Sequence, residues 1–197
     1  QTYSICNLYL DTINDELIVR SLEKPAFKEK IRLRSYGQAG LNDTVYLESK
    51  KKFNSLVNKR RTPVILKDAY AYFKDGKKPE NSNLNEQVFK EIDYIMKFYN
   101  LQPKVFISYD RLAFFEKNNS DFRLTIDKNI QTRRTDLGLE LPAGGTQLLP
   151  PGTWLMEAKA FKAFPLWFVQ FLSSRKIFNT SFSKYGAEYK LYKQEEH

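Results

Sequence analysis

One stretch of the chain, Glu29–Tyr36, reads EKIRLRSY, and its basic residues alternate with apolar ones. Lys30, Arg32 and Arg34 occupy every second position, with an isoleucine and a leucine between them. Because successive side chains of a β-strand point to opposite faces of the sheet, the stretch predicts a strand with one basic face and one apolar face. A basic strand face is the property from which the fold can be inferred.

The same alternation recurs in three further stretches, Thr44–Phe53, Asp121–Asp127 and Leu155–Ala160. Each has charged or hydrogen-bonding groups on one face and apolar groups on the other. The polar positions are Tyr46, Glu48, Lys50 and Lys52, then Arg123, Thr125 and Asp127, then Glu157 and Lys159. For any single strand, the pattern favours an open antiparallel sheet with one solvated face.

The charge is concentrated in one segment. Residues 28–61 hold ten Lys or Arg and three Asp or Glu, a net +7 of the formal +9 of the chain. A solvated face usually mixes both signs, because like charges on neighbouring strands repel. Carboxylates also lie within the basic stripes, and basic groups with a few carboxylates suit a phosphate chain that carries a divalent ion. The pattern favours a closed antiparallel barrel with its charged face inside and helices packed outside.

The rest of the chain predicts one α+β domain, residues 1–197, built mostly of antiparallel strands. Two further strands are expected, at Tyr3–Asp11 and Lys104–Phe115. Helices are expected at Asn14–Leu22, Leu66–Phe73, Asn85–Tyr99, Pro165–Ser174 and Ser183–Tyr192. The segment Leu137–Gly152 has Gly-Gly and Pro-Pro pairs and is expected to be a long loop.

The composition excludes several classes of chemistry. Cys6 is the only cysteine, which rules out an intrachain disulfide and suits a buried, inert thiol. His197, at the end of the chain, is the only histidine, so catalysis by histidine is not expected. The dense apolar stretch Phe164–Leu172 is too short to span a membrane. The aromatic run Phe161–Phe171, which overlaps it, is expected to pack in a core or on a helix. The chain has no GxxxxGK[ST] phosphate loop.

Eight short motifs, taken together, resemble the polyphosphate polymerase domain of vacuolar transporter chaperone proteins. That domain is a branch of the triphosphate tunnel metalloenzyme (CYTH-like) superfamily, and the likeness is to its bacterial-type members. The motifs keep their order through nearly the whole chain. They are Tyr9–Thr12, Ile31–Gly37, Tyr46–Lys50, Lys59–Arg61, Tyr109–Arg111, Phe122–Asp127, Leu155–Lys159 and Phe182–Tyr185.

The resemblance implies a tunnel-shaped barrel in which the γ-phosphate of ATP is transferred to a growing inorganic polyphosphate chain. It implies catalytic phosphate contacts from Arg32, Arg34, Lys50, Arg123 and Lys184. Further phosphate-binding residues would be Lys59, Lys159 and Arg111. It implies a Mn²⁺ or Mg²⁺ cofactor held by Glu157, with Glu48 as a second carboxylate. An opening strand of the family would precede Gln1, and Ser181 stands where eukaryotic members tend to carry a lysine.

Other functions remain open at this point. A triphosphatase would use the same site with water as the attacking group, and a binding module would keep the tunnel without turnover. A nucleic-acid-binding domain is disfavoured, because the basic residues alternate along strands and do not interleave with exposed aromatic platforms. Lys52, Lys59, Arg60 and Arg61 are expected either to guide a product chain or to form a solvated basic hairpin. A cytoplasmic protein without a membrane segment is expected, and the sequence specifies no oligomeric state.

Overall fold

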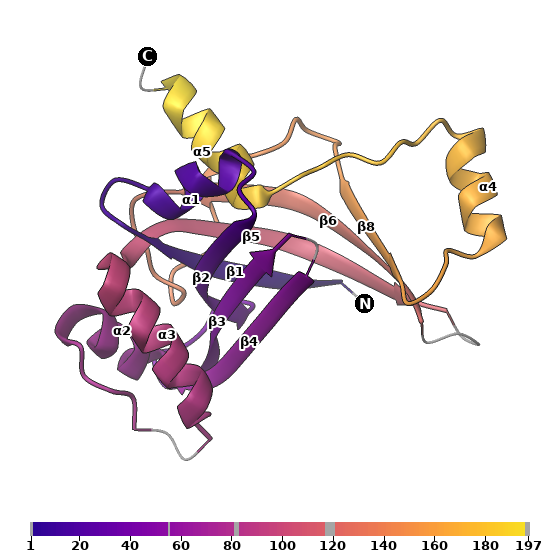
Figure 1. Ribbon diagram of the computed structural model, residues 1–197. Coiled ribbons are helices and arrows are strands. Elements are labelled where there is room, and N and C mark those ends of the chain that lie inside the picture. The colour runs from indigo at the N-terminus through magenta and orange to yellow at the C-terminus, as the bar shows by residue number, and fades with distance from the viewer. Residues whose placement is uncertain (1, 55, 81–82, 117–120, 196–197) are drawn as a thin grey trace.

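The computed structural model describes residues 2–54, 56–80, 83–116 and 121–195. Within these ranges, eight strands form one antiparallel sheet that is accompanied by five helices (Figure 1). The strands are β1 (Thr2–Asp11), β2 (Phe27–Tyr36), β3 (Thr44–Phe53), β4 (Leu56–Ile65), β5 (Gln102–Phe115), β6 (Phe122–Arg133), β7 (Thr146–Gln147) and β8 (Leu155–Ala160). The helices are α1 (Glu16–Leu22), α2 (Leu66–Asp75), α3 (Glu86–Tyr99), α4 (Leu166–Ser174) and α5 (Lys184–Glu195). Gln1 and His197 lie outside the described residues.

The register of the sheet confirms the predicted strand faces. The strand order is β4-β3-β2-β1-β5-β6-β7, and β8 pairs with the same strand, β6, as β7. Arg32 lies opposite Glu48 between β2 and β3, and Thr125 lies opposite Glu157 between β6 and β8. Directly paired residues share a face of the sheet. The polar positions of these four strands therefore form one continuous surface, which we call the charged face.

The expected closed barrel is not observed among the described residues, because the sheet stays open between β4 and β8. Both edge strands nevertheless line one cavity, β4 with Lys59 and Arg61 and β8 with Lys159. If β4 and β8 paired through backbone hydrogen bonds, Lys59 and Arg61 would lie opposite Lys159. The repulsion between these positive charges opposes closure of the barrel. The α+β class and the antiparallel sheet are as predicted.

Two helices cover the apolar face, as expected. Ile31 and Leu33 of β2 are fully buried in one core cluster with Phe89 and Ile92 of α3. A buried side chain of this size stabilises the fold by about 1.5–3 kcal/mol. The α3 helix begins where its sequence predicts, since the side chain of Asn85 accepts a hydrogen bond from the backbone N–H of Val88 at 3.1 Å. These helices cover the face of the sheet that lies opposite the charged face.

The last helix, α5, does not lie outside the sheet as expected. Its Tyr185 ring stacks on Tyr9 of β1 at 4.8 Å, and the Tyr185 hydroxyl donates to Asp11 at 2.8 Å. Tyr9 lies opposite Arg32 in the register, so α5 covers one end of the charged face. Figure 1 shows α5 beside α1 at this end of the sheet.

The aromatic run Phe161–Phe171 is buried only in part. Phe168 of α4 is 2% exposed and packs on Phe122 at a ring distance of 4.9 Å. Phe161 is 80% exposed and lies outside the core, whereas Trp167 of α4, 55% exposed, packs edge-on against Phe122 at 5.8 Å. Figure 1 shows α4 set apart from the other helices, and few elements are therefore available to bury it.

Candidate functional site

A buried carboxylate, Glu48, holds three cations of the charged face in place. Its oxygens lie 2.6 Å from Arg32, 3.8 Å from Arg34 and 3.2 Å from Lys59. Burial alone would raise the pKa of Glu48, but the three cations outweigh it and hold the pKa below its usual range. Glu48 is therefore ionised at neutral pH and serves to orient basic side chains that come from β2 and β4.

A second buried carboxylate, Asp127 of β6, orients basic side chains on the other side of the charged face. Arg111 donates to both of its oxygens, at 2.6 and 2.8 Å, and Lys184 of α5 donates at 2.6 Å. Burial opposes the charge of Asp127, yet Arg111 and Lys184 keep its pKa below the ordinary value. This contact fixes the first residue of α5 against the sheet.

Between these two clusters lies a cavity of about 360 Å³, which we call the charged cavity. Its lining is strongly basic, with six cations and a single carboxylate among the described residues. The lining side chains are Tyr3, Ile5, Arg34, Tyr36, Lys59, Arg61, Arg111, Arg123, Thr125, Glu157 and Lys159. An excess of guanidinium and ammonium groups in a small cavity suits a ligand that carries several negative charges.

Two arginines of the charged cavity keep donors available for a ligand. Arg34, which lines the cavity, donates from Nε to Asn7 at 3.0 Å, and this bond does not use its terminal nitrogens. The Nε of Arg123 is buried and has no hydrogen-bond partner within the described part of the chain. The Arg123 guanidinium instead lies 5.0 Å from the ring centre of Phe115. An unsatisfied buried donor of this kind is costly unless a ligand satisfies it.

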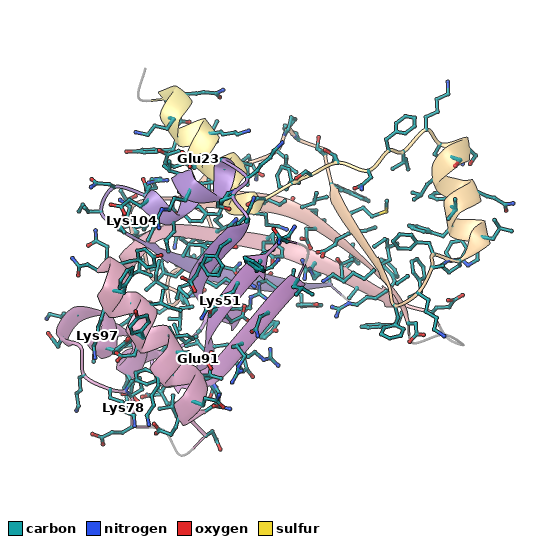
Figure 2. All side chains as sticks on the ribbon, in the orientation of Figure 1. Glu23, Lys51, Lys78, Glu91, Lys97 and Lys104 are labelled. Carbon is teal, nitrogen blue, oxygen red and sulfur yellow. The ribbon has the colours of Figure 1, made fainter. Side chains whose placement is uncertain are left out.

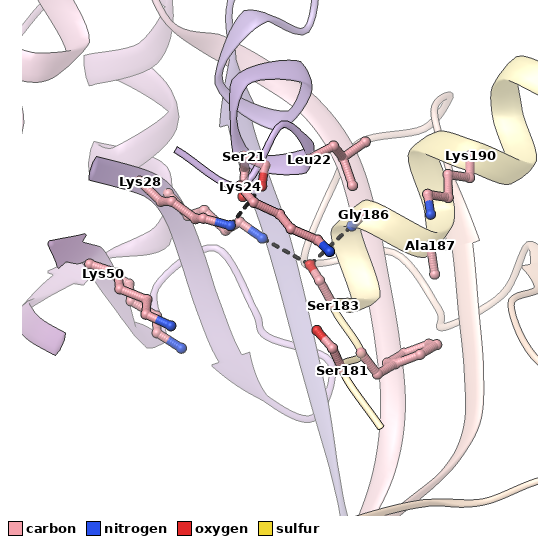
Figure 3. A pocket seen from close by; sticks show the side chains of 13 residues that line it. Ser21, Leu22, Lys24, Lys28, Lys50, Ser181, Ser183, Gly186, Ala187 and Lys190 are labelled. Atoms are coloured by element: carbon pink, nitrogen blue, oxygen red, sulfur yellow. Dashed lines mark hydrogen bonds between the residues drawn. The ribbon is translucent and has the colours of Figure 1, made fainter. Parts of the chain in front are cut away.

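The structure brings together six of the ten predicted site residues. The six that line the charged cavity are Arg34, Lys59, Arg111, Arg123, Glu157 and Lys159. Arg32 and Lys184 lie at its edge in the carboxylate clusters, with Glu48 as the partner of Arg32. Lys50 lines a second cavity, of about 660 Å³, between β3 and the helices α1 and α5 (Figure 3). The roles of all ten residues stay predictions.

The predicted basic group at residues 59–61 is divided by the strand on which it lies. Lys59 and Arg61 of β4 line the charged cavity, whereas Arg60 lies 3.6 Å from Glu91 of α3. Figure 2 labels Glu91. The structure therefore separates Arg60 from Lys59 and Arg61, and the solvated hairpin and the product guide both stay predictions. Arg61 was not among the predicted site residues, although its spacing of two from Lys59 was a usable signal.

One carboxylate of the site, Glu157, suits a divalent ion that is held in part by the substrate. Among the described residues, no group of three or more His, Cys, Asp or Glu side chains is placed to hold a metal. Glu157 faces the charged cavity, half-exposed and 3.1 Å from Lys159, whereas both oxygens of Glu48 face cations. Burial opposes ionisation of Glu157, but Lys159 and Arg111 lower its pKa. Mg²⁺ and similar ions are commonly bound by one or two carboxylates together with substrate phosphates, and Glu157 fits that mode.

Known proteins share this sequence pattern and fold. The sequence profile of the VTC domain family matches residues 1–193. The vacuolar transporter chaperone complex subunit 4 of Schizosaccharomyces pombe is 27% identical over 172 residues, which cover 71% of this chain and 24% of that protein. A crystal structure of a putative adenylate cyclase from Bacillus halodurans superposes with a TM-score of 0.55 at 12% identity, over 92% of this chain and 79% of the other.

The chain combines an α+β fold with a basic cavity on one face of its antiparallel sheet. It belongs to the VTC domain family. It spans about a quarter of the length of the fission-yeast relative. Its fold is similar to that of the Bacillus halodurans protein. In the ranges that the structure describes, no helix is both long and apolar enough to cross a bilayer.

Proposed function

We propose that the charged cavity binds the triphosphate of ATP and transfers its γ-phosphoryl group to inorganic polyphosphate. The observation that carries the proposal is the lining of six cations and one carboxylate in about 360 Å³. Guanidinium groups bind phosphate oxygens through two parallel hydrogen bonds, and ammonium groups add charge without a fixed geometry. Membership of the VTC domain family and the likeness to a vacuolar transporter chaperone subunit support the same substrates.

The transfer needs no nucleophile from the protein. A terminal oxygen of the acceptor phosphate attacks the γ-phosphorus in line, and the bond from that phosphorus to the bridging oxygen breaks. ADP leaves with the electron pair of that bond. Arg34, Arg123 and Lys59 neutralise the negative charge on the transferred group and on the leaving oxygen. Cys6 does not take part, since it is buried in the apolar core, where burial raises the pKa of its thiol.

Glu157 is the residue that would hold Mn²⁺ or Mg²⁺ in this site. Such an ion supplies charge neutralisation at the phosphate oxygens when it is bound. The side chain of Glu157 is within 3.1 Å of the Lys159 ammonium, which holds the carboxylate on the cavity side of β8. Thr125, directly opposite Glu157 on β6, lines the same cavity and limits the space around the carboxylate.

The proposal is tested with γ-labelled ATP, Mn²⁺ and a short polyphosphate primer. Labelled polymer is resolved on a gel, and free phosphate is measured in the same reaction. Wild-type protein is expected to yield polymer. The variant Glu157→Gln is expected to lose turnover by about 100-fold, as for removal of one stabilising group, while it still binds triphosphate because its cavity becomes more positive. Glu86→Gln, which removes an exposed carboxylate on α3, serves as the control.

The results separate the rival functions. Release of phosphate without polymer identifies a triphosphatase. Triphosphate binding without either product identifies a binding module. Turnover of Glu157→Gln at the wild-type rate in saturating Mn²⁺ contradicts the role given to Glu157.

A further inference from the structure

The asparagine Asn7 lies on the central strand β1, next to residues that line the charged cavity. Its side chain is 0% exposed. In the register of the sheet it lies opposite Arg34 of β2 on one side and opposite Ile107 of β5 on the other. Because directly paired residues share a face of the sheet, Asn7 belongs to the charged face. A buried amide in this place needs a partner for its donor and a partner for its acceptor.

The side-chain amide of Asn7 connects β5 to Arg34. Its Nδ2 donates to the backbone carbonyl of Ile107 at 3.1 Å, and its Oδ1 accepts a hydrogen bond from the Nε of Arg34 at 3.0 Å. The carbonyl of Ile107 can only accept, so this bond specifies which end of the amide faces Arg34. Both bonds are buried. The position of the guanidinium is therefore set by the backbone of β5, through Asn7.

Asn7 differs in charge from the groups that orient other cations of the charged face. Glu48 forms an ion pair of 2.6 Å with Arg32, and Asp127 forms ion pairs with two cations. The Nε of Arg34 lies 3.8 Å from Glu48, which is beyond hydrogen-bonding distance. A carboxylate offsets the charge of the cation that it orients, whereas the oxygen of an amide is neutral. Arg34 is therefore held in place and keeps its charge.

This way of holding an arginine suits a phosphate contact. A guanidinium binds two phosphate oxygens through two parallel N–H groups, and such a contact depends on the orientation of its plane. The bond to Asn7 uses the Nε of Arg34 and leaves the two terminal nitrogens for a ligand. A group that is oriented before the substrate binds also loses less conformational entropy when it binds.

We propose that Asn7 is a positioning residue for phosphoryl transfer, because it orients Arg34 toward the triphosphate without neutralising it. The inference rests on the proposed function and names the group that prepares one of its phosphate contacts. Asn7 acts through Arg34 and does not line the charged cavity itself. The neutral amide is essential to this role. An aspartate of the same shape would also hold the guanidinium, but its charge would compete with that of the phosphate.

The test uses two substitutions of Asn7 and one control. Asn7→Asp keeps the shape of the side chain and adds a negative charge, whereas Asn7→Leu keeps a similar volume and removes both hydrogen bonds. Asn7→Leu is also made together with Arg34→Gln, with Arg34→Gln alone as the reference. The control Thr132→Val removes a buried hydrogen bond of 3.1 Å from Thr132 to the carbonyl of Phe106, which precedes Ile107 on β5. Thr132 does not line the charged cavity.

Three measurements are made on each protein. Calorimetry gives the affinity for tripolyphosphate. Labelled ATP gives kcat and KM for phosphoryl transfer, and urea denaturation gives the stability of the fold. The ratio of kcat to KM separates a change in substrate binding from a change that appears only in the transition state.

The two substitutions of Asn7 should have different effects. In Asn7→Leu, Arg34 keeps its charge but loses its orientation, so kcat should fall about tenfold while KM rises by no more than about threefold. In Asn7→Asp, affinity for tripolyphosphate should fall about tenfold or more, as for loss of a hydrogen bond to a charged group. In the Arg34→Gln background, Asn7→Leu should change kcat by less than about twofold. Thr132→Val should unfold at lower urea concentration and keep wild-type affinity and kcat.

Each comparison can overturn the assignment. An equal loss of kcat from Asn7→Leu with and without Arg34 would show that Asn7 does not act through the arginine. Equal losses in Asn7→Leu and Thr132→Val would reduce Asn7 to a structural role. Wild-type affinity in Asn7→Asp would contradict the need for a neutral partner, and this variant keeps the inference testable if Asn7→Leu does not fold. Wild-type protein that binds tripolyphosphate but transfers no phosphoryl group contradicts the proposed function alone, since the affinities of the same variants still measure the coupling of Asn7 to Arg34.

Discussion

Tyr9 lies at the centre of the charged face, between Arg32 and the ring of Tyr185. Arg32 donates to the Tyr9 hydroxyl at 3.1 Å, and the two tyrosine rings are stacked. Burial alone would raise the pKa of Tyr9, but Arg32 and Lys30 outweigh it and lower the pKa to about 8. The pKa of Tyr9 is therefore a measure of the positive electrostatic potential at the charged face, where a phosphate would bind.

We predict that one tyrosine of the folded protein ionises near pH 8 and that it is Tyr9. Because the folded pKa lies below the unfolded value near 10, ionised Tyr9 stabilises the fold above pH 10. This contribution, at most about 3 kcal/mol, is lost as the pH falls through 8. Phenolate absorbance should show this ionisation in wild type and in Tyr94→Phe, an exposed control. An unchanged titration curve in Tyr9→Phe would contradict the prediction.

Strand β4 shows where prediction from the sequence fails and why. Its sequence, LVNKRRTPVI, has three adjacent cations and Pro63, and this order obscures the alternation. Proline is tolerated in a sheet chiefly on edge strands, and β4 is one of the two edges. The pairing of Glu48 with Arg61 and of Lys50 with Lys59 then fixes which cations reach the site.

The alternation on β4 predicts unequal effects for neighbouring residues. Lys59→Gln/Arg61→Gln should lower the affinity for tripolyphosphate by about tenfold at 0.15 M salt, since two cavity charges are lost. Arg60→Gln removes only a partly exposed pair with Glu91, worth at most about 1 kcal/mol, and should leave that affinity unchanged. Calorimetry of the three proteins measures both effects. If Arg60→Gln lowered the affinity for tripolyphosphate as much as the double variant does, the three cations would act only through the net charge of the protein.

Other elements were predictable because their signals are local. The strand Glu29–Tyr36 and the capped helix that follows Asn85 depend on neighbours within a few residues, and both are where expected. The position of α5 depends on Tyr185 meeting Asp11, 174 residues away in the sequence, and no local pattern records such a contact. For the same reason the sequence did not show that Glu48 orients Arg32 and Lys59, which come from two different strands; the metal role that the resemblance implies for Glu48 stays a prediction.

At the scale of the whole molecule, one arginine joins three distant segments. Arg134, just after β6, donates to Glu188 of α5 and to Asp15 before α1, both at 2.8 Å. All three side chains are largely buried. Glu188 and Asp15 raise the pKa of Arg134, although burial opposes its charge. Because α1 and α5 line a cavity of about 660 Å³ together with β2 and β3, this ion-pair group holds that side of the cavity against the sheet.

Arg134→Gln should therefore destabilise the protein and loosen α5 in particular. Loss of one partner leaves Glu188 buried without its counter-ion, which costs about 3 kcal/mol. Arg20→Gln, on the exposed side of α1, should change the unfolding free energy by no more than about 0.5 kcal/mol. Urea denaturation gives both values, and a cycle with Glu188→Gln isolates the pair. Hydrogen exchange should increase in α5 before it increases in the central strand β1, because α5 is attached through this group and through Tyr185 and Lys184. An Arg134→Gln variant as stable as wild type, with α5 still protected, would show that apolar packing of Tyr185 alone holds the helix.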